Sequence, residues 1–148
     1  QEVQHSHWPS SSWCMAYAPN GEHLAVGYHS GHVQLFEAAS LSLVQEVQHS
    51  HFRILCMAYA PNGEHLAMGY SNAHVQLFEA ASLSLVQDVQ HSHETARCMA
   101  YAANGEHLAM GDPGGYVQLL EAASLSLIQE VQHSHWPSSS WCMAYAPN

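Results

Sequence analysis

The sequence is built from one unit of about 42 residues that recurs almost unchanged along the chain. One heptapeptide, QEVQHSH or QDVQHSH, opens every unit and begins at Gln1, Gln45, Gln87 and Gln129. Residues 129–148 repeat residues 1–20 without a change. Identity this high indicates recent amplification of one unit or deliberate design, and both origins stay open. We divide the chain into a single repeat domain with units 1–44, 45–86, 87–128 and a partial unit 129–148.

Each unit has the pattern of four short strands joined by tight turns. In the second unit an apolar run is followed by Pro61-Asn62-Gly63, a turn sequence in which glycine supplies the positive φ. Later in the unit, apolar and polar residues alternate with the period of two that half-buried strands show. We expect strands over 54–60, 64–69, 74–79 and 83–90. We expect a core that contains Tyr17, Tyr59, Tyr101, Leu24, Leu66 and Leu108.

Four strands in about 42 residues match one blade of a β-propeller. The sequence therefore predicts an all-β fold of four-stranded antiparallel blades, with about 3.5 repeats of 42 residues in the chain. One segment of each unit leaves an alternative open. The stretch EAASLSLVQEVQ, residues 37–48 in the first unit, is rich in Ala, Leu, Glu and Gln, which favour a helix.

The unit resembles the tryptophan–aspartate (WD) repeat family over essentially the whole chain. His51 stands at the family's Gly-His pair, Pro61-Asn62-Gly63 resembles its Ser-Pro-Asp-Gly turn, and Phe78-Glu79 replaces its Trp-Asp pair. The resemblance implies propeller blades but no particular activity, since propellers host many functions. The family's turn aspartate between the second and third strands is absent, so its internal hydrogen-bond network should be incomplete. The residues at that position are Ser30, Asn72 and Gly114.

The charge of the chain argues against several classes of partner. The formal net charge is −10, and Arg53 and Arg97 are the only cationic side chains besides histidine. We expect no binding to nucleic acid or to anionic membranes, because both need basic surfaces. No apolar run approaches the roughly 20 residues of a membrane span, and we expect no signal peptide.

The cysteines and the periodicity argue against a disulfide framework and against catalysis. Cys14, Cys56, Cys98 and Cys142 occupy the same position in their units, which predicts small buried thiols kept reduced, as is typical of an intracellular protein. No Ser-His-Asp arrangement and no phosphate-binding glycine loop stands out. We therefore expect no catalytic residue and no cofactor.

One histidine motif leaves a metal-binding alternative open. Two histidines at i and i+2 of an extended segment point the same way, and neutral imidazoles bind zinc, copper or nickel. The competing interpretation makes the second histidine structural and places the first on a loop surface. The four pairs are His5/His7, His49/His51, His91/His93 and His133/His135.

The units differ mainly in two segments, before the first strand and between the second and third strands. In a four-stranded meander these two segments emerge on the same side, and all four tryptophans and both arginines lie in them. Loops rich in aromatic and Arg residues are typical of protein recognition, although neutral drift in tolerant loops explains variation equally well. The candidate partner-binding residues are Trp8, Trp13, His29, Phe52, Arg53, Asn72, Glu94, Arg97, Asp112 and Trp136.

These observations predict a non-enzymatic propeller-type scaffold that binds a protein or peptide. Because propellers close with four to eight blades, we also expect the chain to associate with further copies of itself to complete its array. A filament built by continuation of identical units is the alternative, and metal binding through His-Ser-His is the second alternative.

Overall fold

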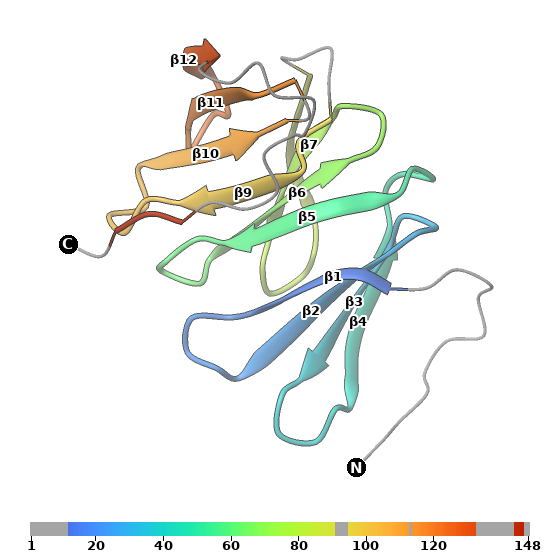
Figure 1. Cartoon of the computed structure of the whole chain (residues 1–148). Coiled ribbons are helices and arrows are strands. Elements are labelled where there is room, and N and C mark those ends of the chain that lie inside the picture. Colours follow the sequence, from blue (N-terminus) through green and yellow to red (C-terminus); the bar gives the residue numbers. More distant parts are fainter. Residues whose placement is uncertain (1–11, 91–94, 113, 133–143, 147–148) are drawn as a thin grey trace.

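The computed structural model describes residues 12–90, 95–112, 114–132 and 144–146, and all regular structure in those ranges is β. Twelve strands in the described ranges form three four-stranded antiparallel sheets, which stand one behind the next (Figure 1). We call these sheets blades 1, 2 and 3. The all-β fold of four-stranded blades predicted from the sequence is confirmed. The described ranges contain no helix that is long and apolar enough to cross a membrane.

Each blade is a meander in which consecutive strands pair. Blade 1 contains β1 (Ser12–Tyr17), β2 (His23–Tyr28), β3 (His32–Glu37) and β4 (Leu43–Gln48). Blade 2 contains β5 (Ile54–Tyr59), β6 (His65–Tyr70), β7 (Val75–Glu79) and β8 (Leu85–Val89). Blade 3 contains β9 (Cys98–Tyr101), β10 (His107–Gly111), β11 (Tyr116–Glu121) and β12 (Leu127–Gln132). The strands predicted for the second unit agree with β5 to β8 to within two residues at each end.

The turn between the first and second strands is fixed by its Asn-Gly sequence. In blade 2, Gly63 has a φ of 77°, and its N–H donates to the carbonyl of Ala60 at 2.9 Å. The side chain of Asn62 accepts a hydrogen bond from the Glu64 N–H at 2.9 Å. Glycine reaches this φ without the steric cost that a Cβ brings. The turn therefore sets the register of the hairpin in each blade.

The segment that could be read as a helix forms a turn followed by a strand. Leu83, predicted to be the first residue of the fourth strand, lies in the turn with a φ of 58° and is fully buried. Its N–H donates to the carbonyl of Glu79 at 2.8 Å. The strand starts at Leu85, whose side chain is exposed. The left-handed turn directs Leu83 into the core, and alternation along the segment does not reveal this.

The blades pack face to face through apolar side chains, and their first strands, β1, β5 and β9, lie beside one another (Figure 1). One cluster joins blade 1 to blade 2, and a second cluster joins blade 2 to blade 3. The first cluster includes Ala25, Val33, Leu35, Leu66, Met68, Tyr70, Phe78 and Leu83. Burial of so many apolar side chains makes the largest favourable contribution to the stability of such a stack of blades.

The expected core is confirmed for the leucines and is wrong for one tyrosine. Leu24, Leu66 and Leu108 are all buried. Tyr59 packs in part against the cluster between blades 1 and 2, and Tyr101 packs in the same way one blade further on. Tyr17, the equivalent residue of blade 1, is 65% exposed. It has no described blade in front of it, so position in the stack decides its burial.

Candidate interaction surface

The two variable segments of each unit come together at one end of the blades, which we call the loop face. It consists of the connections that lead into β5 and β9 and of the hairpins β2–β3, β6–β7 and β10–β11. The Ser71 N–H donates to the Arg53 carbonyl, and the Arg97 N–H to the Gly111 carbonyl, both at 2.8 Å. The Asn-Gly turns lie at the opposite end of the blades (Figure 1).

A close approach of two main chains links the loops of blades 1 and 2. Gly31, in the β2–β3 hairpin, has a φ of 87°. A Cβ at Gly31 would lie 2.0 Å from the carbonyl oxygen of Ser50. The Gln48 side chain adds a hydrogen bond to the Ser30 carbonyl at 2.9 Å. The hairpin of blade 1 is therefore held directly against the segment that carries Phe52.

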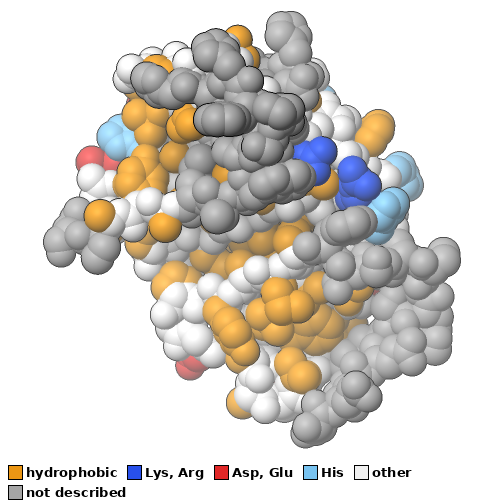
Figure 2. All heavy atoms as spheres, viewed as in Figure 1, with side chains coloured by type: hydrophobic (Ala, Val, Ile, Leu, Met, Phe, Trp, Pro, Cys, Tyr) orange, Lys and Arg blue, Asp and Glu red, His pale blue; other side chains and the backbone are white. Residues whose placement is uncertain are grey.

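Phe52 and the two arginines are the aromatic and cationic candidate residues in the described part of the loop face. Phe52 is 51% exposed, and its N–H donates to Ser50 Oγ at 3.2 Å. Arg53 and Arg97 are half-buried. Figure 2 shows both cations on the same side of the molecule, near histidine side chains. This combination of aromatic and guanidinium groups is common where proteins bind one another.

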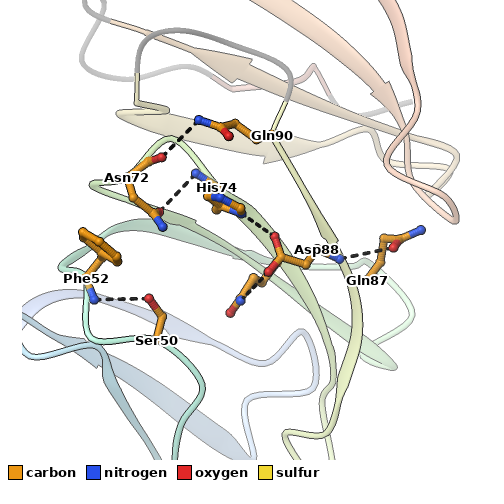
Figure 3. Close-up of polar contacts among 8 residues, drawn as sticks. Ser50, Phe52, Asn72, His74, Gln87, Asp88 and Gln90 are labelled. Atoms are coloured by element: carbon orange, nitrogen blue, oxygen red, sulfur yellow. Dashed lines mark hydrogen bonds and ion pairs between the residues drawn. The ribbon is translucent and has the colours of Figure 1, made fainter.

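Asn72 has a structural role in the β6–β7 hairpin. Its side-chain oxygen accepts a hydrogen bond from the His74 N–H at 3.2 Å, and its carbonyl accepts one from Gln90 at 3.4 Å. His74 Nδ1 lies 2.6 Å from Asp88 Oδ1, and Gln76 donates to Asp88 Oδ2 at 3.0 Å (Figure 3). The Asp88 carboxylate thus joins two strands just beneath the loop face.

Asp112 also has a structural role, because its side chain is buried in the β10–β11 hairpin. Asp112 Oδ1 accepts hydrogen bonds from the N–H groups of Gly114 at 2.9 Å and Tyr116 at 3.1 Å. It supplies the turn carboxylate that is missing at Gly114 itself. A buried carboxylate that accepts main-chain bonds stabilises a turn and presents little surface to a partner.

The other candidate residues divide between exposed and undescribed positions. His29 is exposed in the β2–β3 hairpin. Trp13 lies in β1, but its side chain is not described, and Trp8, Glu94 and Trp136 lie outside the described residues.

The described His-Ser-His pair does not converge on one point. His49 stacks on Phe78 with ring centroids 5.3 Å apart, and its Nε2 donates to the Leu83 carbonyl at 3.0 Å. His51 is exposed and lies 3.1 Å from the Gln48 amide through Nδ1. Both histidines are exposed and each makes a side-chain contact, so this pair does not divide into one structural and one surface histidine. Among the described residues, no group of three or more His, Cys, Asp or Glu side chains could hold a metal ion.

The described cysteines are free thiols in apolar surroundings. Cys56 and Cys98 are buried, and Cys56 Sγ donates to the Ala96 carbonyl at 3.4 Å. Burial raises the pKa of Cys14 to about 12 and raises the pKa of Cys56 further. Neutral thiols of this kind pack as small apolar groups and are poor nucleophiles.

A buried glutamine at the centre of each third strand is a feature that the sequence analysis missed. Gln34, Gln76 and Gln118 are buried, and each donates to a carboxylate on the adjacent fourth strand. The distances are 3.3 Å from Gln34 to Glu46, 3.0 Å from Gln76 to Asp88 and 2.6 Å from Gln118 to Glu130. These pairs cross-link the third and fourth strands of each blade. The signal was present, since a polar residue recurs at the centre of each apolar third strand.

Comparison with known proteins agrees with this architecture. A family model described as the anaphase-promoting complex subunit 4 WD40 domain matches residues 9–60 and 48–104, which together cover more than half of the chain. The chain belongs to the WD40 family. No curated protein sequence shows a significant match to this WD40 chain.

Two solved WD40 structures show how much of a propeller the chain represents. The first, titled "Structure of U3-55K", has a TM-score of 0.87 at 15% identity, over 96% of this chain and 45% of that chain. The second, "Crystal structure of RRP9 WD40 repeats", has a TM-score of 0.85 at 15% identity, over 96% and 44%. The WD40 chain thus spans less than half the length of either protein. At this identity the likeness establishes the fold alone.

Proposed function

We propose that the chain is a non-enzymatic WD40 interaction module that binds a protein or peptide on the loop face. The observation that carries the proposal is where the units differ. The segments that vary between units are hydrogen-bonded to one another on the loop face, whereas the Asn-Gly turns at the opposite end keep their sequence. Variation concentrated on one face of a rigid stack is how a repeat scaffold acquires a binding surface.

The contact chemistry within the loop face is carried by Phe52, Arg53 and Arg97. Aromatic and Arg side chains dominate the binding energy of most interfaces. Asn72 and Asp112 serve the site differently, since their side chains hold the hairpins that flank these residues. We also assign a partner-binding role to His29, whose side chain is exposed at the edge of the same face.

The experiment is a selection of peptides from a randomised display library on the immobilised chain, followed by calorimetry on the enriched sequences. Phe52→Ala and Arg53→Ala should each weaken binding by about 1–3 kcal/mol. Asn62→Ala and Glu64→Ala, on the opposite end of the blades, are the matched controls and should leave the affinity unchanged. Loss of binding in these controls, with full binding by Phe52→Ala, would contradict the assignment of the face.

Association of the chain with further copies of itself is the second part of the proposal. Three described blades do not close a ring, and a propeller of four or more blades buries the sheet faces that a shorter stack leaves open. Sedimentation of the 148-residue chain should show a mass above 16.3 kDa that rises with concentration. A constant 16.3 kDa species over a wide concentration range would exclude this part of the proposal.

Two alternative functions, filament formation and metal binding, can be distinguished by experiment from association into closed rings. A filament would appear as fibres by electron microscopy, and its length would grow with concentration. Metal binding through the His-Ser-His pairs would appear as heat on titration with zinc or copper, and a His49→Ala, His51→Ala double variant would reduce the number of sites.

A further inference from the structure

Two sheet faces meet wherever blades pack in this structure, and they carry different side chains. The Met-Tyr face contains the Met and Tyr of the first strand, such as Met57 and Tyr59 in blade 2. The Val-Leu face contains the Val and Leu of the third strand, such as Val33 and Leu35 in blade 1. The Met-Tyr face of blade 2 packs on the Val-Leu face of blade 1, and blade 3 packs on blade 2 in the same way.

Blade 1 and blade 3 each present one of these faces without a described blade against it. On the Met-Tyr face of blade 1, Met15 is 60% exposed, whereas the equivalent Met99 is buried. On the Val-Leu face of blade 3, Val117 is 38% exposed, whereas the equivalent Val75 is buried. Figure 2 shows hydrophobic side chains gathered over β1 and β2 on the viewed side. The two open faces are the same pair that already meets twice within the chain.

A short segment of the same chain already lies on the open face of blade 3. Ala144 and Tyr145 line a cavity of about 460 Å³ together with Ala109, Val117 and Leu119. The segment 144–146 lies beside β9 (Figure 1). Residues 142–148 have the same sequence as residues 14–20, so Tyr145 corresponds to Tyr17. In sequence Tyr145 also corresponds to Tyr101, whose side chain packs against the cluster between blades 2 and 3.

We propose that the Val-Leu face of blade 3 is the docking site for the Met-Tyr face of blade 1 of a second copy, and that Tyr145 of the same chain competes for that site. The inference rests on the proposed self-association and specifies its surface and its regulation. Continuity with the two interfaces inside the chain identifies the occupant, because blade 1 carries the same Met and Tyr that blades 2 and 3 use.

The competition sets how association depends on concentration. A tethered segment acts at a high effective concentration, on the order of millimolar when the linker is short. A second copy brings a whole sheet face with the exposed side chains of Met15 and Tyr17, and so buries more apolar surface than residues 144–146 alone. The second copy therefore displaces Tyr145 only as the chain concentration rises. The contact is head-to-tail, so repeated docking yields rings or open stacks.

The test uses one substitution at two positions with the same local sequence. In the full 148-residue chain, Tyr17→Glu and Tyr145→Glu each place a carboxylate in an identical Met-Ala-Tyr-Ala context. Tyr17→Glu charges the docking surface and should raise the concentration for half association by about tenfold or more. Tyr145→Glu removes the competitor and should lower that concentration by about threefold or more, since a larger fraction of sites is then open. Val86→Glu, at an exposed position of β8 in the central blade, is the control for added surface charge and should leave association unchanged.

Sedimentation velocity over a concentration series measures the association of all four proteins, and far-ultraviolet circular dichroism checks that each is folded. Should Tyr17→Glu lose its β spectrum, Met15→Glu replaces it as the docking variant. Wild-type association that neither tyrosine variant alters would overturn the docking assignment and leave self-association standing. A monomeric wild type whose Tyr145→Glu variant associates would support competition and would refute the association proposed for the wild-type chain. If wild type and Tyr145→Glu were both monomeric, both proposals would fail. Weaker association of Tyr145→Glu would show that the segment aids docking, and would overturn its role as a competitor.

Discussion

Gly31 is the position where a single added methyl group should cost the fold most. Its φ of 87° lies in the left-handed region, which costs an alanine about 1 kcal/mol. The new Cβ would also lie 2.0 Å from the Ser50 carbonyl oxygen and 2.9 Å from that of Phe52. Both are main-chain atoms, so relief requires the hairpin or the 49–52 segment to move, at a cost of about 2 kcal/mol or more. We expect Gly31→Ala to lower the free energy of unfolding by about 3 kcal/mol.

Two other positions in the chain serve as matched controls for this variant. Gly21 has a φ of 75° but no atom within 4 Å of its would-be Cβ, so Gly21→Ala should lose only about 1 kcal/mol. Ala73 occupies the position of Gly31 in blade 2, with a φ of 72°. Ala73→Gly removes that strain while adding freedom to the unfolded chain, so its stability should change by less than about 1 kcal/mol.

Urea unfolding followed by circular dichroism gives the three free energies under one set of conditions. The reasoning is refuted if Gly31→Ala loses no more stability than Gly21→Ala. Because Gly31 lies against the segment that carries Phe52, the variant should also weaken peptide binding on the loop face. Unchanged binding would show that the position of Phe52 does not depend on this contact.

Three further predictions concern the buried or partly buried side chains of Tyr59, Asp112 and Cys56. Burial raises the pKa of Tyr59 to about 12 from about 10 when unfolded, so its contribution to stability should be full below pH 10 and lost as pH rises toward 12. Tyr59→Phe should reduce this loss of stability at alkaline pH, whereas Tyr17→Phe, at an exposed position, should not. If Tyr59→Phe lost as much stability at alkaline pH as the wild type, the prediction would be wrong. Asp112→Ala should cost about 1–3 kcal/mol in urea unfolding, because two main-chain donors lose their acceptor, and an unchanged midpoint would argue against that role. Cys56 should resist iodoacetamide at pH 8 until urea unfolds the chain, and modification in the folded state would show that the thiol is accessible.

The blade could be predicted from the sequence because its determinants are local. Alternation set the strands, and Pro61-Asn62-Gly63 set the first turn, whose hydrogen bonds involve residues no more than five apart. The error at Leu83 has a different origin. A leucine in the left-handed conformation is rare, and burial between strands and blades stabilises it there together with the turn hydrogen bond to Glu79. Nothing within five residues of Leu83 reports on that packing.

The candidate interaction surface could be predicted only in outline. Sequence variation located the loop face, because consecutive units can be compared within one chain. It did not separate Phe52, whose ring is exposed, from Asp112, whose carboxylate turns inward to its own hairpin. It also gave no indication that His49 stacks on Phe78. Side-chain direction in a turn depends on one or two dihedral angles, which residue type alone does not fix.

Near-identity of the units means that the same residue has different physical roles in different blades. Tyr17, Tyr59 and Tyr145 share one sequence context, yet the first is exposed on blade 1, the second packs between blades, and the third lies on blade 3. The same position of the repeated unit can therefore be a core residue in one blade and a docking residue in another. What differs is whether another blade stands in front of it. The effect of a substitution on stability therefore depends on which blades pack against the substituted residue. The same substitution at equivalent tyrosines should have effects that differ in size and, for association, in sign.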